Sequence, residues 1–233
     1  MTGKKKNQMY PWVDVKRNFI GGKCPHECVY CYVEALKKRF PGVRTRYSGE
    51  LYLIEKELGK GEGCGHMTFV QDCGDLFAEQ IPDEWIDRVL RHCSDYPENT
   101  YLFQSKNPQR FIEFKDRFPK NAILGTTIES NRDYGVSKAP DVYSRANGIE
   151  SMGINGFTVM VSVEPIMDFD SEDFVELLQF IGPEFVSIGA DSKNNRISEP
   201  TPEKVRAFID QVRRFTEVKL KSNLARLGVA KDD

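Results

Sequence analysis

The regular alternation of strand-like and helix-like segments is the feature that most limits what this chain can fold into. Short runs rich in β-branched and aromatic residues recur along it, at 67–72, 100–104, 122–128, 157–163 and 185–189. Such runs are typical of strands buried on both faces of a parallel sheet. Amphipathic stretches separate them, so the pattern predicts parallel strands joined by crossover helices.

Three stretches, which begin at Pro82, Ser171 and Thr201, place apolar side chains every three or four residues, as one face of a helix requires. We expect Ser171 and Thr201 to cap their helices, and Pro82 suits a first helical turn. With a strand at 13–19 there are six βα units, and 217–221 predicts one more strand. We therefore predict an α/β fold, a partial (β/α)6 TIM-like barrel of parallel strands with outer helices, because a closed eight-unit barrel needs about 250 residues.

The length of 233 residues suits one domain, with a core over about 12–191 and a C-terminal helix and strand within 201–223. The 33 basic and 35 acidic residues give a net charge of −2, which disfavours an evenly basic surface but allows a local basic groove. No apolar run approaches the roughly 20 residues that cross a bilayer. The start of the chain, 1–6, is polar, so we expect no membrane partner and a reducing, cytoplasmic location.

Three cysteines, Cys24, Cys28 and Cys31, are spaced C-x3-C-x2-C directly before a helix-like stretch that begins at Tyr32. Thiolates this close bind iron–sulfur clusters or zinc. A cluster normally takes four cysteines, so three leave one iron open to another molecule. Zinc is the alternative, with His26 among further ligands, although zinc sites usually combine two C-x2-4-C pairs and a second pair is missing here.

The cysteine spacing, with Tyr30 just before the last cysteine, resembles the signature of the radical S-adenosylmethionine (SAM) superfamily. Further segments resemble landmarks of a radical SAM branch common in phages and prophages; they are 70–77, 126–129, 161–165 and 185–191. The resemblance implies that Cys24, Cys28 and Cys31 hold a [4Fe–4S] cluster whose open iron binds SAM. It also implies reductive cleavage of SAM to a 5′-deoxyadenosyl radical, which abstracts hydrogen from a substrate, and an electron donor such as flavodoxin or ferredoxin.

Polar residues follow the predicted strands, and in a parallel barrel these strand ends meet at one mouth. They are Cys73, Asp75, Lys106, Glu129, Glu164 and Asp191. Acidic residues beside apolar runs are uncommon unless something pairs with them. SAM, with its ammonium and sulfonium groups and its ribose hydroxyls, would supply such partners.

The resemblance implies particular contacts with SAM. Gly74 and Asp75 match the turn that receives its ammonium group, although Asp75 is one methylene shorter than the usual glutamate. Thr127 or Glu129 matches the ribose contact, and Tyr30 would pack beside the adenine. Two further roles are proposed for strand-end residues: Lys106 as a partner of the SAM carboxylate, and Glu164 as a SAM or substrate contact.

Each of these residues also has a structural alternative. Asp75 could cap a loop or helix, and Glu129 could close a loop through a hydrogen bond. Glu164 could pair with Arg145 or a lysine, Lys106 could be a solvated turn residue, and Tyr30 could be a core residue beneath the cysteine loop. Asp191 carries the weakest signal of the set.

Cys73 is a candidate catalytic residue, because its position after a strand places it near the expected SAM site. We hypothesise that it relays a hydrogen atom. The alternative is a small apolar filler, the more usual role of a lone cysteine.

The substrate is left open between nucleic acid, a small molecule and a peptide. Basic residues at 37–39 with Arg44 and Arg46, at 213–214 and at 219–221 could line a nucleic-acid groove, with Phe40 and Tyr47 as stacking surfaces. A non-catalytic zinc module that contacts nucleic acid or protein is the alternative from another functional class.

Overall fold

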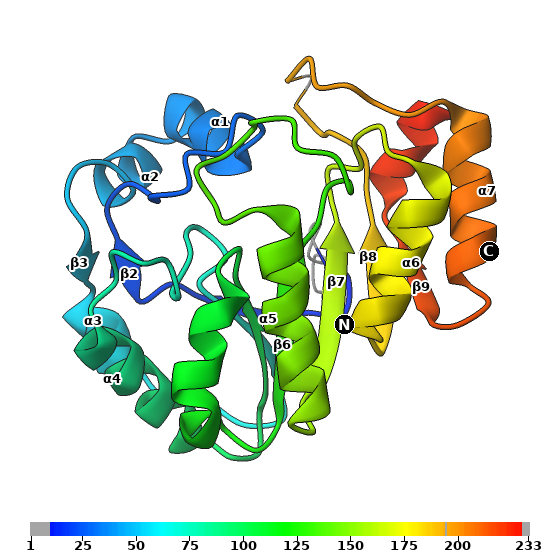
Figure 1. Cartoon of the computed structure of the whole chain (residues 1–233). Helices are drawn as coiled ribbons and strands as arrows, with labels where there is room; N and C mark the ends of the chain where they lie inside the picture. The colour runs from blue at the N-terminus through cyan, green and yellow to red at the C-terminus, as the bar shows by residue number, and fades with distance from the viewer. Residues whose placement is uncertain (1–9, 194, 230–233) are drawn as a thin grey trace, which may run out of the picture.

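The main sheet of the computed structural model, which describes residues 10–193 and 195–229, has seven parallel strands in the order β1-β4-β5-β6-β7-β8-β9 (Figure 1). The strands are β1 (Val15–Arg17), β4 (Met67–Val70), β5 (Thr100–Gln104), β6 (Ala122–Thr127), β7 (Thr158–Val163), β8 (Phe185–Ile188) and β9 (Glu217–Leu220). The predicted α/β fold, a partial TIM-like barrel, is confirmed. The strand expected at 217–221 is β9, and it extends the sheet by pairing in parallel with β8.

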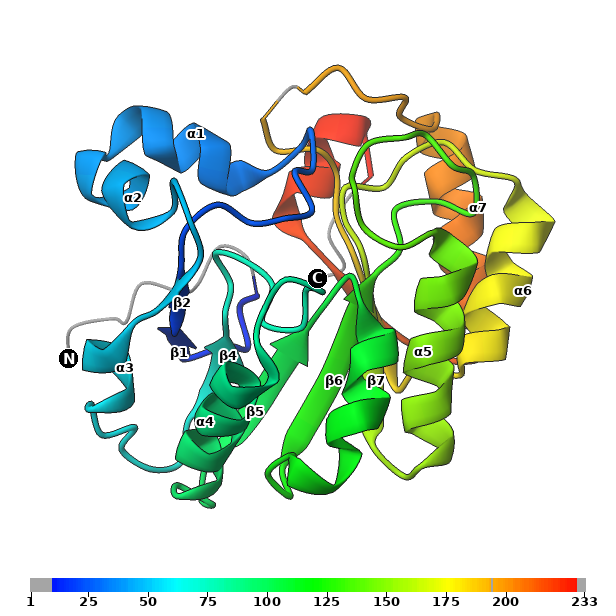
Figure 2. The same ribbon diagram turned by 60° about the vertical axis from the view of Figure 1, so that its left-hand side comes forward.

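Helices cover the outer face of this sheet, side by side in Figure 2. They are α4 (Asp83–Ser94), the 3-10 helix η1 (Pro108–Arg117), α5 (Val142–Ile154), α6 (Ser171–Ile181) and α7 (Pro202–Val212). Thr201 caps α7 as expected, since its side chain accepts a hydrogen bond from the Lys204 amide. The prediction for Ser171 was wrong: Asp170 occupies the N-cap position of α6, and its carboxylate binds Arg132 rather than the helix amides.

A long insertion between β1 and β4 carries the cysteine motif. Its elements are β2 (Ile20–Gly21), α1 (Tyr32–Arg39), α2 (Pro41–Arg46), β3 (Tyr52–Leu53) and α3 (Glu55–Leu58). The helix predicted from Tyr32 is α1, while the antiparallel β2–β3 pair and the helices α2 and α3 were not predicted. Gly22 is required where this insertion turns, because its φ is +91° and a Cβ there would lie 2.2 Å from the Glu50 carbonyl oxygen.

A small apolar cluster fills the interior on the inner face of the sheet. It consists of Tyr10, Val13, Phe69, Leu102, Met160 and Phe185. The larger core lies on the outer side, between the strands and the helices. Since side chains alternate along each strand, the inner face presents apolar residues low on the strands and polar residues at their carboxyl ends. Tyr10 contacts both sets of residues: it belongs to the apolar cluster, and its hydroxyl donates a hydrogen bond of 2.8 Å to Gln104, at the carboxyl end of β5.

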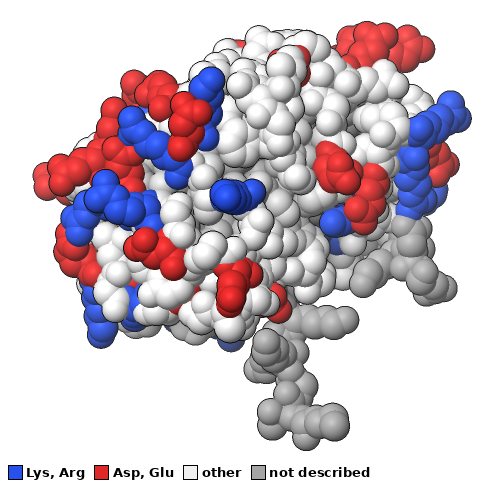
Figure 3. Space-filling model, turned by 90° about the horizontal axis from the view of Figure 1, so that it is seen from below, with Lys and Arg blue, Asp and Glu red and all other residues white. Residues whose placement is uncertain are grey.

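The face seen in Figure 3, from below in the orientation of Figure 1, carries charges of both signs. Lysines and arginines alternate with carboxylates around its rim, and the middle of the face is largely uncharged. No continuous basic surface crosses this view. Across residues 10–193 and 195–229, no helix has both the length and the apolar character needed to span a membrane.

β2, β3 and the three short helices of the insertion place the cysteine loop beyond the carboxyl ends of the strands, on the side opposite to Figure 3 (Figures 1 and 2). The fold thus brings residues from the whole length of the chain to one end of the sheet.

Candidate functional site

A cavity of about 960 Å³ opens at the carboxyl ends of the strands. Nearly all of the residues that the sequence singled out line it: Cys24, Cys28, Tyr30, Cys31, Cys73, Gly74, Asp75, Lys106, Thr127, Glu164 and Asp191. Glu129 is the exception, because it is buried behind this wall. One cavity therefore collects three cysteines of the same loop and polar groups from successive strand ends.

The cysteine loop leads directly into α1, whose N-cap residue is Cys31. No side chain caps this helix end, so its first amide groups are left for another acceptor. These amides and the positive end of the helix dipole favour a negatively charged group beside Cys31. Burial, with the charge of Asp75 adding to it, raises the pKa of the Cys24 thiol to about 12, so this thiol must release a proton when it binds a metal.

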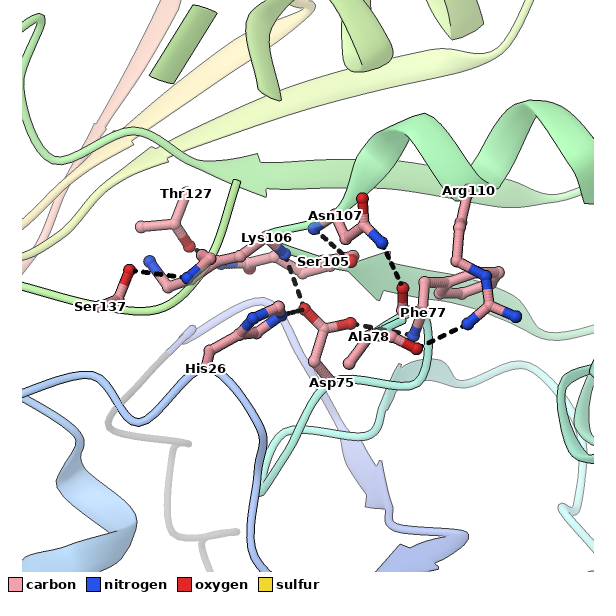
Figure 4. A network of polar contacts seen from close by, with 12 residues as sticks. His26, Asp75, Phe77, Ala78, Ser105, Lys106, Asn107, Arg110, Thr127 and Ser137 are labelled. Atoms are coloured by element: carbon pink, nitrogen blue, oxygen red, sulfur yellow. Dashed lines mark hydrogen bonds and ion pairs between the residues drawn. The ribbon is translucent and has the colours of Figure 1, made fainter. Parts of the chain in front are cut away.

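His26, inside the cysteine loop, anchors the loop to the sheet. Its Nε2 lies 2.7 Å from Oδ2 of Asp75, and both residues are buried. Asp75 also accepts hydrogen bonds from the amides of Lys106, at 2.7 Å, and Phe77, at 2.9 Å (Figure 4). Burial alone would raise the pKa of Asp75, but the charge of His26 and these hydrogen bonds hold it below its ordinary value. Protein donors thus occupy both oxygens of Asp75, and its carboxylate ties the loop to the ends of β4 and β5.

The segment that follows β6 makes a second set of contacts with the cysteine loop. The Lys138 amide donates to the His26 carbonyl at 2.7 Å, and the Val29 amide donates to the Val136 carbonyl at 2.9 Å. Glu27 is held between the ammonium groups of Lys23 and Lys138, each at 2.6 Å. The cysteine loop is therefore fixed on two sides by contacts within the protein itself.

Glu129 is the centre of a buried charge network. Its carboxylate pairs with Arg145 at 2.9 Å and makes close contacts with the Lys106 ammonium and the Tyr30 hydroxyl. The Lys106 ammonium lies 2.6 Å from the same hydroxyl. Burial would raise the pKa of Glu129, yet the charges of Lys106 and Arg145 lower it to about 2. Glu129 thus holds Tyr30 and Lys106 in the cavity wall, and Arg145 is its partner rather than that of Glu164.

Glu164 instead pairs with a lysine that follows β9. The Lys221 ammonium makes a close ion pair with it, and the Asn223 amide donates to its Oε1 at 3.0 Å. A Cβ on Gly189, which follows β8, would lie 2.7 Å from Oε1 of Glu164, so a larger residue there would displace this carboxylate. Burial lowers the pKa of Lys221, against the opposing charge of Glu164.

Sequence reasoning missed the roles of His26, Lys221 and Asn223 in this site. His26 had been considered as a zinc ligand, and Lys221 as part of a basic surface. The available signal was position: Lys221 is the last residue of the predicted strand 217–221, and Asn223 follows it, as Glu164 follows the strand predicted at 157–163.

Cys73 lies on the cavity wall beside a tyrosine from α1. Its Sγ is 3.6 Å from the Tyr32 hydroxyl, which also donates to Oδ2 of Asp72 at 2.9 Å. Burial, together with the charge of Asp72, raises the pKa of the Cys73 thiol to about 12, so it keeps its hydrogen at neutral pH. Cys64 and Cys93 do not line the cavity: Cys64 is exposed, and Cys93 is buried in α4.

The described residues contain no group of three His, Cys, Asp or Glu side chains arranged to hold a single metal ion. The three loop cysteines nevertheless line one cavity. A zinc ion would require its ligands to converge around itself, whereas in a cubane cluster each thiolate binds a different iron.

A family model matches residues 10–207, and its description is "Protein of unknown function (DUF5131)". No curated protein matches the chain. Among solved structures, a spore photoproduct lyase mutant with bound AdoMet and dinucleoside spore photoproduct is similar with a TM-score of 0.64 and 12% identity, over 93% of this chain and 78% of that one.

Streptococcus suis SuiB bound to the precursor peptide SuiA has a TM-score of 0.58 and 8% identity, over 89% of this chain and 48% of that one. SuiB bound to S-adenosylmethionine has a TM-score of 0.54 and 8% identity, over 88% and 49%. This chain thus spans about half the length of SuiB. At identities this low, the likeness concerns the fold.

Proposed function

This chain belongs to the family described as "Protein of unknown function (DUF5131)", and we propose that it is a radical SAM enzyme, related to the branch common in phages and prophages. One observation carries the proposal: Cys24, Cys28 and Cys31 line the cavity at the carboxyl mouth of a partial barrel. Two radical SAM enzymes with a similar fold, spore photoproduct lyase and SuiB, have been solved with AdoMet or S-adenosylmethionine bound.

The residues present fit a [4Fe–4S] cluster. Three thiols line one cavity, and the uncapped start of α1 favours negative charge beside them. The loop is already fixed by His26 and by its hydrogen bonds with the segment after β6. When bound, the cluster supplies the electron for reductive cleavage of SAM, taken from a donor such as flavodoxin or ferredoxin. A zinc-binding module stays the alternative, because closely spaced cysteine thiolates also bind zinc.

The cavity wall also offers groups for SAM. We assign the ribose contact to Thr127, whose side chain lines the cavity, and give Glu129 the task of holding Lys106 and Tyr30 in place. Tyr30 presents a ring for the adenine, and Lys106 a cation for the carboxylate. Gly74 leaves room beside the Asp75 turn, and Glu164 faces the cavity from the far side, toward SAM or the substrate.

For the substrate we propose a nucleotide unit, with a small molecule or a peptide as the alternatives. The spore photoproduct lyase structure holds a dinucleoside and the SuiB structure a precursor peptide, so this fold accommodates both classes. A cavity of about 960 Å³ has to contain the cofactors as well, so it admits one unit of a polymer rather than a long stretch.

An anaerobic assay tests the enzyme proposal. We expect the chain, reconstituted with iron and sulfide and supplied with SAM and a strong reductant, to release 5′-deoxyadenosine. A fully loaded cluster that neither binds SAM nor cleaves it would contradict the proposal. A protein that binds zinc and never loads iron would favour the zinc module instead.

We further propose that Cys73 gives a hydrogen atom to a carbon radical in the cavity, which leaves a thiyl radical, and that the Tyr32 hydroxyl, 3.6 Å from Sγ, returns a hydrogen atom to it. The tyrosyl radical that results takes one electron from the same donor or reductant that supplies the cluster and one proton from solvent. A thiol hydrogen exchanges with solvent, so 5′-deoxyadenosine formed in D₂O without substrate should carry deuterium. We expect Cys73→Ala to lose most of this label while still cleaving SAM, and Cys64→Ala, which changes an exposed cysteine, to keep it. Mass spectrometry of the product measures both, and equal labelling in Cys73→Ala would leave the residue as a filler.

A further inference from the structure

The helices α1 and α2 form a hairpin, residues 32–47, that stands out from one end of the sheet (Figures 1 and 2). We call it the basic hairpin. Leu36, Lys37 and Tyr47 line the cavity, so the inner side of the hairpin is part of the cavity wall. The hairpin therefore borders the cavity, and a substrate segment that extends beyond the cavity on this side would meet it.

Three cations of the basic hairpin, Lys38, Arg39 and Arg44, are exposed to solvent. Within residues 10–193 and 195–229 none of the three forms an ion pair, whereas Lys37 is paired with Glu34. Residues 32–50 hold five cations and two carboxylates, although the whole chain has a net charge of −2. Positive charge is thus concentrated here and left available to an anionic partner.

An exposed aromatic ring lies among these cations. Phe40, between the two helices, is 44% exposed, and the Arg39 guanidinium is 5.1 Å from its ring centroid. Tyr47, which the sequence suggested as a second stacking surface, is buried. Phe40 therefore supplies a single solvent-facing ring flanked by positive charge.

The basic segment 219–221 does not extend this surface. Lys221 is buried against Glu164, and the Lys219 ammonium lies 3.7 Å from the centroid of the Phe185 ring. Lys219 lies in β9 and Lys221 directly follows it, at the edge of the sheet away from the basic hairpin (Figures 1 and 2). Residues 219–221 therefore do not extend the surface of the basic hairpin.

We propose that the basic hairpin binds single-stranded nucleic acid at the cavity mouth, with Lys38, Arg39 and Arg44 on phosphates and a base stacked on Phe40. The assignment rests on the proposed function, in which one nucleotide unit enters the cavity. Cations interleaved with an exposed ring are what single-strand binding uses, since unpaired bases expose their faces while phosphates need positive charge. An acidic protein would form ion pairs with the cations but would offer no base to stack on the Phe40 ring.

Binding of a fluorescein-labelled 12-nucleotide oligo-dT to the cluster-loaded protein, without SAM or reductant, tests the proposal. Each lost phosphate contact should reduce the salt slope by about 0.7, so K38A/R39A/R44A should lower it by about 2. The matched control K115A/K120A/R214A removes three exposed cations near the amino ends of β6 and β9, and it should leave the slope unchanged.

Phe40→Leu separates stacking from charge, because leucine keeps an apolar side chain but lacks the aromatic face. We expect it to weaken binding by about 5- to 150-fold, the range for one stacked base, with an unchanged salt slope. Unchanged affinity in Phe40→Leu, or equally strong binding of polyglutamate at the same site, would overturn the proposal in favour of an acidic protein partner.

The binding assay and the cleavage assay fail independently. Loss of oligonucleotide binding alone would remove this inference and leave the radical SAM proposal intact. Absence of 5′-deoxyadenosine with normal binding would do the reverse.

Discussion

Cys28→Ala will abolish iron loading and, with it, formation of 5′-deoxyadenosine. The wild-type chain should bind about four irons with sulfide, and the variant nearly none, because a cluster held by three thiolates has no protein ligand to spare. Loss of a residue that merely supports a ligand costs about 10- to 100-fold in metal affinity, so loss of the ligand itself should cost more. Iron and sulfide content, absorbance of the anaerobic protein and product formation measure the effect.

The chain provides a matched control for this experiment. Cys64→Ala also removes one thiol, but Cys64 is exposed and does not line the cavity, so iron content and product formation should stay at the wild-type level. Circular dichroism would verify that both variants are folded. Full iron loading and activity in Cys28→Ala would show that the three-cysteine assignment is incorrect.

Sequence patterns predicted the five central strands well because each lies in a short run rich in β-branched and aromatic residues. The runs from 67–72 to 185–189 all became strands, and the strand expected at 217–221 is β9. The insertion between β1 and β4 was different. Its two strands have two residues each, and they pair only with each other, so neither carries a periodicity that sequence alone could reveal.

The candidate site was predicted as a set of positions but not as a set of pairs. The rule that strand ends meet at one mouth brought Asp75 and Glu164 to one cavity, whereas Glu129 is buried behind the cavity wall. Which cation each carboxylate binds depends on side-chain distances across the sheet. His26 meets Asp75 from a loop 49 residues earlier, and Lys221 reaches Glu164 from 57 residues later, so no local pattern links them.

Glu129→Gln will destabilise the protein strongly. The carboxylate is buried between Lys106 and Arg145, and glutamine keeps its size but leaves both cations without a counter-charge. Breaking a buried ion pair from one side typically costs 3–5 kcal/mol, so we expect a loss of about that size in the free energy of unfolding. Urea denaturation at pH 7, on the chain before iron is added, measures it. Glu98→Gln, which changes an exposed glutamate, should alter stability by less than about 0.5 kcal/mol.

The effect of Glu129→Gln on the free energy of unfolding should depend on pH. The pKa of Glu129 falls from 4.5 to about 2 on folding, so the ionised carboxylate stabilises the folded state at every pH above 4.5. That stabilisation, on the order of 3 kcal/mol at about 1.4 kcal/mol per pKa unit, is lost as the pH falls from 4.5 toward 2.

The difference in unfolding free energy between the wild type and Glu129→Gln should therefore be constant near neutral pH and narrow through this acidic window. Below it, protonated Glu129 and glutamine are both uncharged. A difference that stayed constant from pH 7 to pH 2 would mean that charge at Glu129 does not hold Lys106 and Tyr30 in the cavity wall. Their positions would then have to come from packing alone.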